Sequence, residues 1–145
     1  MSLPNPDDEP GLYRDLILKR FVAWSVDLVI TLVIVAAIVI MTVFLGLFFL
    51  PVLWFAVSVT YRAVMLSNYS ATAGMMLAAI RLRHLDGRRP DPVICVLHSV
   101  IFSAAMASVV GQIISVGLML ITPYRQGLND VFLQTTMINR YLDDT

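Results

Sequence analysis

An aspartate, Asp27, lies seven residues after Arg20 inside an apolar run, and Arg62 lies near the end of the next apolar stretch. A carboxylate near the middle of a membrane helix costs on the order of 2.5 to 3.5 kcal/mol, so Asp27 needs a partner or water. Arg20 shares a helix stripe with Asp27, but their axial separation of about 10.5 Å is too long for a routine contact. Antiparallel helices would bring Asp27 and Arg62 to similar depths, so we expect these two to pair. The pair could fix helix register or move an ion or proton, or each charge could reach solvent separately.

A second aspartate, Asp130, comes five residues after Arg125, where the chain leaves its last apolar run. Five residues turn a helix by about 500°, about 140° away from alignment, so a direct contact between the two requires a turn. Gly127 can supply that turn. A chain folded back there would bring Asp130 to the arginines at the level of the lipid headgroups. We therefore predict a structural or transport network of polar residues, made of Arg20, Asp27, Arg62, Asp130 and Arg125.

Small side chains recur every four residues in the last apolar run. This spacing places them on one helix face, and small residues let helix backbones approach closely in lipid. The predicted face could pack against helices of the same chain or against a second protein. Its residues are Ser99, Ser103, Ala107, Gly111 and Ser115.

The sequence lacks patterns typical of a catalytic, nucleotide-binding or metal site. It contains no nucleotide-binding glycine loop, catalytic-triad spacing or paired-acid signature. Cys95 and His98 could share a helix face, but two ligands with no carboxylate or further histidine nearby are too few for a metal. We expect no enzymatic activity, no cofactor and no metal.

The elements that hold these residues follow from a very apolar composition. Of 145 residues, 59% are hydrophobic and 14% are charged, against about 25% charged in ordinary soluble domains. The runs 28–61 and 92–124 contain no Asp, Glu, Lys or Arg, and both exceed the roughly 18 apolar residues that indicate a membrane helix. Ten basic and ten acidic residues leave no net charge, which argues against nucleic-acid binding. The pattern predicts an all-α integral membrane protein whose first partner is the lipid bilayer.

The first half of the chain predicts a transmembrane hairpin. We expect its helices over about 21–43 and 48–66, with Gly46 and Pro51 marking the turn. The amphipathic stretch 12–19 is typical of a helix at the membrane interface.

The third apolar segment, 92 to about 121, is too short for two crossings, so it is either one tilted spanning helix or a re-entrant hairpin. We favour a re-entrant segment bent near Gly111 or Gly117. The reason is that 133–138 is rich in strand-forming residues and could pair with 80–85, which requires both to lie on one side of the membrane.

Polar and basic residues fill 67–92, which we predict to be an extramembrane loop. Within it, 72–82 could be an interfacial helix or a strand, and Asp86 with Gly87 indicates a tight turn. The loop could therefore carry a small β element.

The ends of the chain flank one predicted membrane domain, residues 15–139. Residues 1–14 combine acids with prolines, which predicts a mobile acidic tail, and 140–145 form a C-terminal tail.

Basic residues give the orientation of the hairpin. They lie before the first helix and at or after the end of the second, whereas the turn between the helices carries none. By the positive-inside rule, the N-terminus is cytoplasmic and the protein is a multi-pass protein of the cytoplasmic (inner) membrane. The residues are Arg14, Lys19, Arg20, Arg62, Arg81, Arg83, Arg88 and Arg89.

Three motifs in this order carry a resemblance: Lys-Arg-Phe-Val-Ala-Trp-Ser-Val-Asp at 19–27, Ser-Ala-Thr-Ala-Gly at 70–74, and Arg-Gln-Gly-Leu-Asn-Asp at 125–130. Over about residues 15–139 the chain resembles the RDD family of small membrane proteins. The resemblance implies that the family's defining arginine and two aspartates are Arg20, Asp27 and Asp130. Because the resemblance singles out both Arg20 and Asp130, we choose Arg20 as the partner of Asp130.

Further positions match the pattern that family members show after the second helix, and others depart from it. The matches are Ser70, Thr72, Gly74, Arg81, Asp86 and Gly87, and the departures are Met75, Ala79 and Asn129. Asn129 stands where the family usually has a histidine, so the resemblance gives no support to a proton relay built on that histidine. The function that the resemblance implies is the one suggested for the family: transport of unidentified ligands, with ion antiport in some members.

Two functions are open at this point. In the first, the chain is a non-enzymatic accessory or assembly subunit that packs against a larger membrane complex, which its short length favours. In the second, it is a small oligomeric transporter or ion antiporter-like protein that uses the intramembrane Arg and Asp residues. Three helices enclose little volume, so the second function requires a homo-oligomer.

Overall fold

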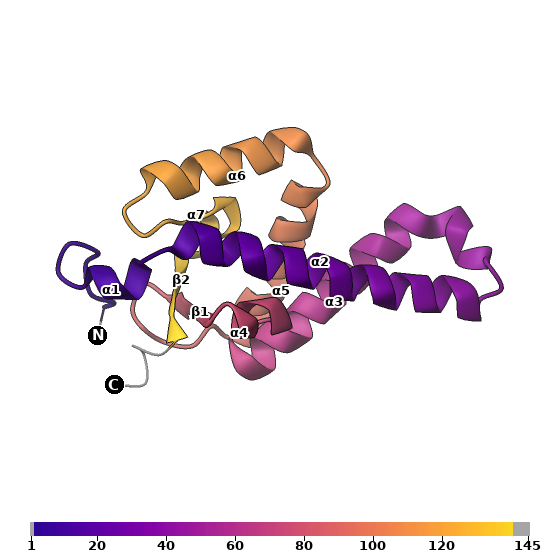
Figure 1. The fold of residues 1–145 in the computed structure, drawn as a ribbon, viewed down its shortest axis with the longest axis horizontal. Helices are drawn as coiled ribbons and strands as arrows, with labels where there is room; N and C mark the ends of the chain where they lie inside the picture. The colour runs from indigo at the N-terminus through magenta and orange to yellow at the C-terminus, as the bar shows by residue number, and fades with distance from the viewer. Residues whose placement is uncertain (1, 141–145) are drawn as a thin grey trace.

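The computed structural model describes residues 2–140, and within them the chain forms a long helical hairpin capped at one end by short elements (Figure 1). Helices α2 (Leu16–Met41) and α3 (Leu50–Tyr69) form the hairpin. With the short elements next to them, they are long and apolar enough to cross a membrane. The predicted tail 140–145 lies outside the described residues apart from Arg140.

Helix α2 buries one stripe along its whole length, with successive buried residues three or four positions apart. This is the spacing of one helix face, so the polar residues on the stripe are drawn into the interior together with the apolar ones. The stripe contains Leu16, Arg20, Ala23, Asp27, Thr31, Val35 and Val39.

The helix begins five residues earlier than predicted. Asp15 has a left-handed backbone (φ 57°), which separates α2 from the one-turn helix α1 (Pro10–Tyr13). The predicted helix over 12–19 is therefore not continuous: residues 12–13 belong to α1 and residues 16–19 to α2, because a residue at positive φ interrupts a helix.

The turn of the hairpin lies where it was predicted. It contains the 3₁₀ helix η1 (Leu45–Phe49), but the residues with positive φ are Val43 and Phe44 and not Gly46. Pro51 is in the first turn of α3. Backbone N–H groups have no helical acceptor there, so a proline, which has no N–H, loses no helical hydrogen bond.

The loop after α3 contains a short helix and a strand, the two alternatives predicted for residues 72–82. Helix α4 (Ala73–Leu77) is followed by strand β1 (Ile80–His84), and β1 pairs antiparallel with β2 (Thr135–Asn139). The strand pairing agrees with the predicted pairing of 80–85 with 133–138. The sheet thus joins residues that are more than 50 positions apart in the chain.

The third apolar segment is two helices, α5 (Pro92–Met106) and α6 (Val109–Ile121), with axes 117° apart. The bend follows Met106, and Ser108 caps α6 by accepting from the Gly111 N–H at 3.0 Å. The predicted bend at Gly111 or Gly117 is therefore misplaced by a few residues, because a capping serine ends one helix and begins the next.

The two outer ends of the bent pair lie at the same end of the hairpin. Strand β1 comes before α5, whereas helix α7 (Leu128–Leu133) and strand β2 come after α6. Because β1 and β2 are hydrogen-bonded to each other, the two ends of the bent pair are held together. A helix pair bent by 117° fits a broken span or a re-entrant loop, and the joined ends favour the second.

The bend also divides the predicted small-residue face, which is not one continuous surface. Ser103 lies 3.1 Å (Oγ to Oγ) from Ser58 of α3, and the Ser115 hydroxyl accepts from the Leu128 N–H at 3.2 Å. A Cβ on Gly111 would lie 2.7 Å from the Ala105 carbonyl oxygen. These small residues serve packing within the chain.

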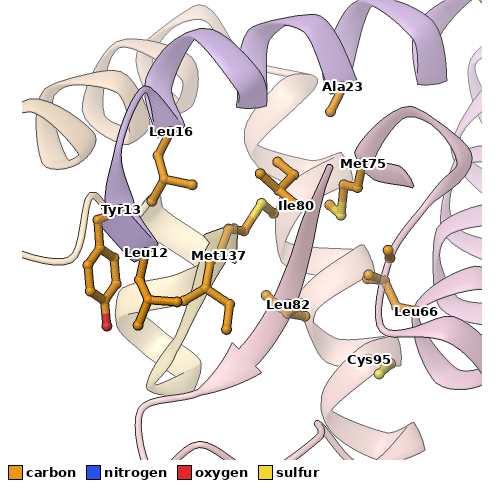
Figure 2. Close-up of a cluster of buried hydrophobic side chains, with 12 residues drawn as sticks. Leu12, Tyr13, Leu16, Ala23, Leu66, Met75, Ile80, Leu82, Cys95 and Met137 are labelled. Carbon is orange, nitrogen blue, oxygen red and sulfur yellow. The ribbon is translucent and has the colours of Figure 1, made fainter. Parts of the chain in front are cut away.

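A hydrophobic core lies under the sheet at the capped end (Figure 2). Residues before α2 belong to it, since Leu12 and Tyr13 are buried there. The Leu3 N–H also donates to the Leu85 carbonyl at 2.7 Å, and the Tyr13 hydroxyl donates to the Pro4 carbonyl at 2.9 Å. The predicted free tail 1–14 is thus docked on the sheet over its described part, because it carries apolar side chains among its acids.

We expect the N-terminal segment, the loop after β1 and the residues after β2 to be on one side of the membrane. In a Cys95→Ala background, Asp8→Cys, Arg88→Cys and Arg140→Cys should react with an impermeant thiol reagent from the same side, and Leu47→Cys from the opposite side. Labelling of Asp8→Cys and Arg140→Cys from different sides would contradict the re-entrant geometry.

Candidate functional site

The Asp27 carboxylate on α2 is surrounded by four hydrogen-bond donors. Oδ1 accepts from the Tyr61 hydroxyl at 2.8 Å and from the Gly74 backbone N–H at 2.9 Å. Oδ2 accepts from the Thr72 hydroxyl at 2.5 Å and from Arg62 Nη1 at 3.4 Å. With the side chain only 7% exposed, these bonds replace the water that the carboxylate loses on burial.

Two of these donors come from the start of α4, which approaches α2 closely. Thr72 caps α4 by accepting from the Met75 N–H at 3.3 Å while its own hydroxyl donates to Asp27. Gly74 is needed at its position, because a Cβ there would collide with the Ala23 carbonyl and lie 2.8 Å from Asp27 Oδ1. The absence of a side chain lets the Gly74 N–H reach the carboxylate.

The structure places Arg62 against Asp27, as the hairpin geometry predicted, but this is the longest of the four bonds. The Arg62 guanidinium also stacks on the Phe102 ring of α5, with its central carbon 3.7 Å from the ring centroid. Arg62 therefore connects three helices, α2, α3 and α5, and its charge is balanced by Asp27.

A second carboxylate, Asp130 at the start of α7, has a donor set of its own. Arg20 Nη2 donates to Oδ2 at 2.5 Å, and the Gly127 N–H donates to the same oxygen at 3.1 Å. Oδ1 lies 2.8 Å from His98 Nε2 and accepts from the Thr135 hydroxyl at 3.1 Å. The Asp130 side chain is fully buried.

Two side chains contact the His98 ring. Its Nε2 lies 2.8 Å from Asp130 Oδ1, and the Asn129 amide nitrogen lies 2.7 Å from Nε2 and 3.3 Å from Nδ1. His98 thus contacts both Asp130 and Asn129 of α7 although it belongs to α5. From the sequence alone, His98 is a candidate only as a metal ligand. The signal for its role was that it is the single histidine in the run 92–124.

The predicted network is therefore two clusters, both held by the buried stripe of α2. Arg20 contributes to one and Asp27 to the other, two helical turns apart. Arg125 belongs to neither. It is exposed, has a left-handed backbone (φ 53°), and donates from Nη1 to the Leu120 carbonyl at 3.0 Å, so its inclusion in the network was wrong.

The charges within the clusters are paired. Burial alone would raise the pKa of Asp130, but the Arg20 guanidinium, His98 and the Gly127 N–H hold it well below its usual range. Asp130 is consequently a carboxylate at neutral pH. Among residues 2–140, no group of three or more His, Cys, Asp or Glu side chains is arranged to hold a metal ion.

A cavity of about 1170 Å³ lies beside the clusters, between α2 and the bent pair. Arg20, Asp27 and Arg62 line part of it, and apolar side chains such as Trp24 and Phe102 line much of the rest. The arrangement combines a polar floor with apolar walls.

We expect Gly74→Ala to lower the stability of the protein in detergent by about 1 to 3 kcal/mol or more, because the new methyl group would push α4 away from α2. Gly117→Ala is the matched control. A Cβ on Gly117 meets no atom within 4 Å, so this change should be neutral or stabilise α6 by up to about 1 kcal/mol. Thermal unfolding followed by size-exclusion chromatography measures both; equal effects would contradict the close approach.

We expect Arg20→Gln and Asp130→Asn each to reduce the amount of folded protein, because either change leaves a buried polar partner unsatisfied. Breaking a buried pair on one side typically costs about 3 to 5 kcal/mol, so the double variant should be little worse than either single one. Arg125→Gln should have little effect, since this side chain is exposed. Strictly additive losses of Arg20→Gln and Asp130→Asn would show that the two residues act independently.

A comparison with known protein families matches residues 15–134 to the RDD family. No curated protein and no solved structure matches the chain. The match covers most of the chain and includes the residues at the centre of both clusters, Arg20, Asp27 and Asp130. Together with its apolar helices, the match shows that this chain is a membrane protein that belongs to the RDD family.

Proposed function

We propose that this protein is a non-enzymatic accessory or assembly subunit that packs against a larger complex in the membrane. The observation that supports this role most directly is the saturation of both buried carboxylates. Asp27 and Asp130 each accept four hydrogen bonds from their own chain. Such clusters hold helices in one arrangement.

A relay for ions or protons needs a carboxylate that can exchange its partners. A new ligand at Asp27 would have to displace donors from α3 and α4 at once, and each displaced donor would lose its acceptor in a buried place. Leaving a buried polar group unsatisfied costs about 1 to 3 kcal/mol. The clusters are therefore better suited to structure than to transport.

The outward side of the hairpin offers a surface for a partner helix. Within helix α3 only Arg62 and Leu66 are buried, and its exposed side carries the small residues Ala56 and Thr60 four positions apart. Small residues at this spacing let a second membrane helix approach closely, and a threonine can hydrogen-bond across the contact.

A small oligomeric transporter is the second candidate. It is favoured by the cavity beside the clusters, since Arg20, Asp27 and Arg62 on its lining could contact a substrate. One chain contributes two long helices and a re-entrant pair, so a path across the membrane would have to form between copies.

The test is the composition of the tagged protein purified in mild detergent from the cells that make it. An accessory role predicts a complex of fixed stoichiometry with a different membrane protein, which Ala56→Leu disrupts. Ala36→Leu, at an exposed position on α2 and away from this side of α3, should leave the complex intact.

A homo-oligomer with no second component would contradict the accessory role and favour transport. A complex that survives Ala56→Leu as well as Ala36→Leu would move the contact away from this side of α3. A monomer in every condition would oppose both functions.

A further inference from the structure

The cavity between α2 and the bent pair opens at the surface of the hairpin. Leu18 and Phe21 of α2 and Val116 of α6 all line it, yet they are 66%, 61% and 51% exposed. On a membrane helix such side chains face acyl chains. The cavity is thus accessible from the bilayer, and its volume of about 1170 Å³ slightly exceeds the roughly 300 to 1,000 Å³ of ordinary small-molecule pockets.

Positive charge predominates among the residues that line the cavity. Two of its arginines, Arg14 and Arg125, are exposed, whereas Arg20 and Arg62 are deep. Two aspartates, Asp15 and Asp27, also line it, which leaves two positive charges in excess. Asp130 behind Arg20 reduces the excess to one. The cavity therefore favours an anion.

The two deep arginines each keep an N–H without an acceptor. Arg20 Nη1 and Arg62 Nε are buried and have no hydrogen-bond partner among the described residues. Both side chains are more than nine-tenths buried and both line the cavity. Buried donors almost always have a partner, and guanidinium groups bind phosphate oxygens well. An anionic group at the arginine side of the cavity would supply the missing acceptor once the guanidinium groups turn toward it, because the two nitrogens have almost no accessible surface in this structure.

We propose that this cavity binds one anionic phospholipid from the bilayer. Its phosphate lies at the arginine side, and its acyl chains follow the apolar walls, which include Trp24, Phe102, Met106 and Met119. Both parts of the cavity match an amphiphile with one negative headgroup, whereas a partner helix would bring no acceptor for the arginines. The proposal does not depend on the accessory role.

The experiment is native mass spectrometry of the delipidated full chain, titrated with phosphatidylglycerol or with phosphatidylcholine of the same acyl chains. We expect one phosphatidylglycerol to bind about tenfold more tightly, the factor that corresponds to about 1.4 kcal/mol. Lipids that only surround the protein should bind in larger numbers and without this preference.

Two sets of variants locate the site. Val116→Trp fills the cavity from α6 and should abolish the preference, whereas Ile113→Trp, exposed on the same helix and outside the lining, should keep it. Combined Arg14→Gln and Arg125→Gln should reduce the preference severalfold without affecting folding, because both side chains are exposed. If Val116→Trp does not fold, Met119→Phe fills the same space from the next turn of α6.

Four results would overturn the proposal. Equal affinity for the two phospholipids would remove the charge argument. A preference that survives both Val116→Trp and Met119→Phe would place the lipid elsewhere. Displacement of phosphatidylglycerol by an equal concentration of oleate would assign the cavity to a free fatty-acid carboxylate. A dimer that Val116→Trp abolishes, with no lipid bound, would assign it to a second copy of the chain.

Discussion

A carboxylate buried in a membrane helix has to be supplied with hydrogen-bond donors by the rest of the chain, and the position of Asp27 imposes this requirement here. Helix α2 can bury Asp27 only because Tyr61 and Arg62 arrive from α3 and Thr72 and Gly74 from the start of α4. The docking of α4 on α2 follows from this need. Since α4 is covalently joined to β1, it also places the sheet at the end of the hairpin.

Asp130 imposes the same requirement on the second half of the chain. Its donors come from α2, α5, the turn before α7 and β2, so the segment after the bent pair must return to the start of α2. The return allows β2 to pair with β1, and this pairing holds the two ends of the bent pair together. The fold of the bent pair is thus a consequence of where Asp130 finds its donors.

Because both carboxylates already have their hydrogen bonds, the polar clusters and the cavity beside them have different roles. The carboxylate oxygens are occupied, but each of the two deep arginines has a nitrogen that lacks an acceptor. The clusters therefore provide rigidity, while the residual binding capacity is cationic and faces a space with apolar walls. A negatively charged amphiphile is the ligand that such a combination recognises, and a bilayer supplies one at high concentration.

The sequence by itself determined the membrane class, the hairpin and the pairing of the strands, because apolar runs, the basic residues at their ends and strand-forming segments are local patterns. It also placed Arg62 near Asp27, since a charge that is costly in lipid has few possible partners. The choice of Arg20 for Asp130 came from the family resemblance. Only the tertiary structure decided the remaining donors. The residues next to them in sequence do not show whether three of these donors are buried or in contact with water: Tyr61, Thr72 and His98. The apolar pattern also continues through residues 107 and 108, so it gives no sign of a bend there. The three donors act on carboxylates that lie more than 30 positions away in the chain, and local patterns do not encode such contacts.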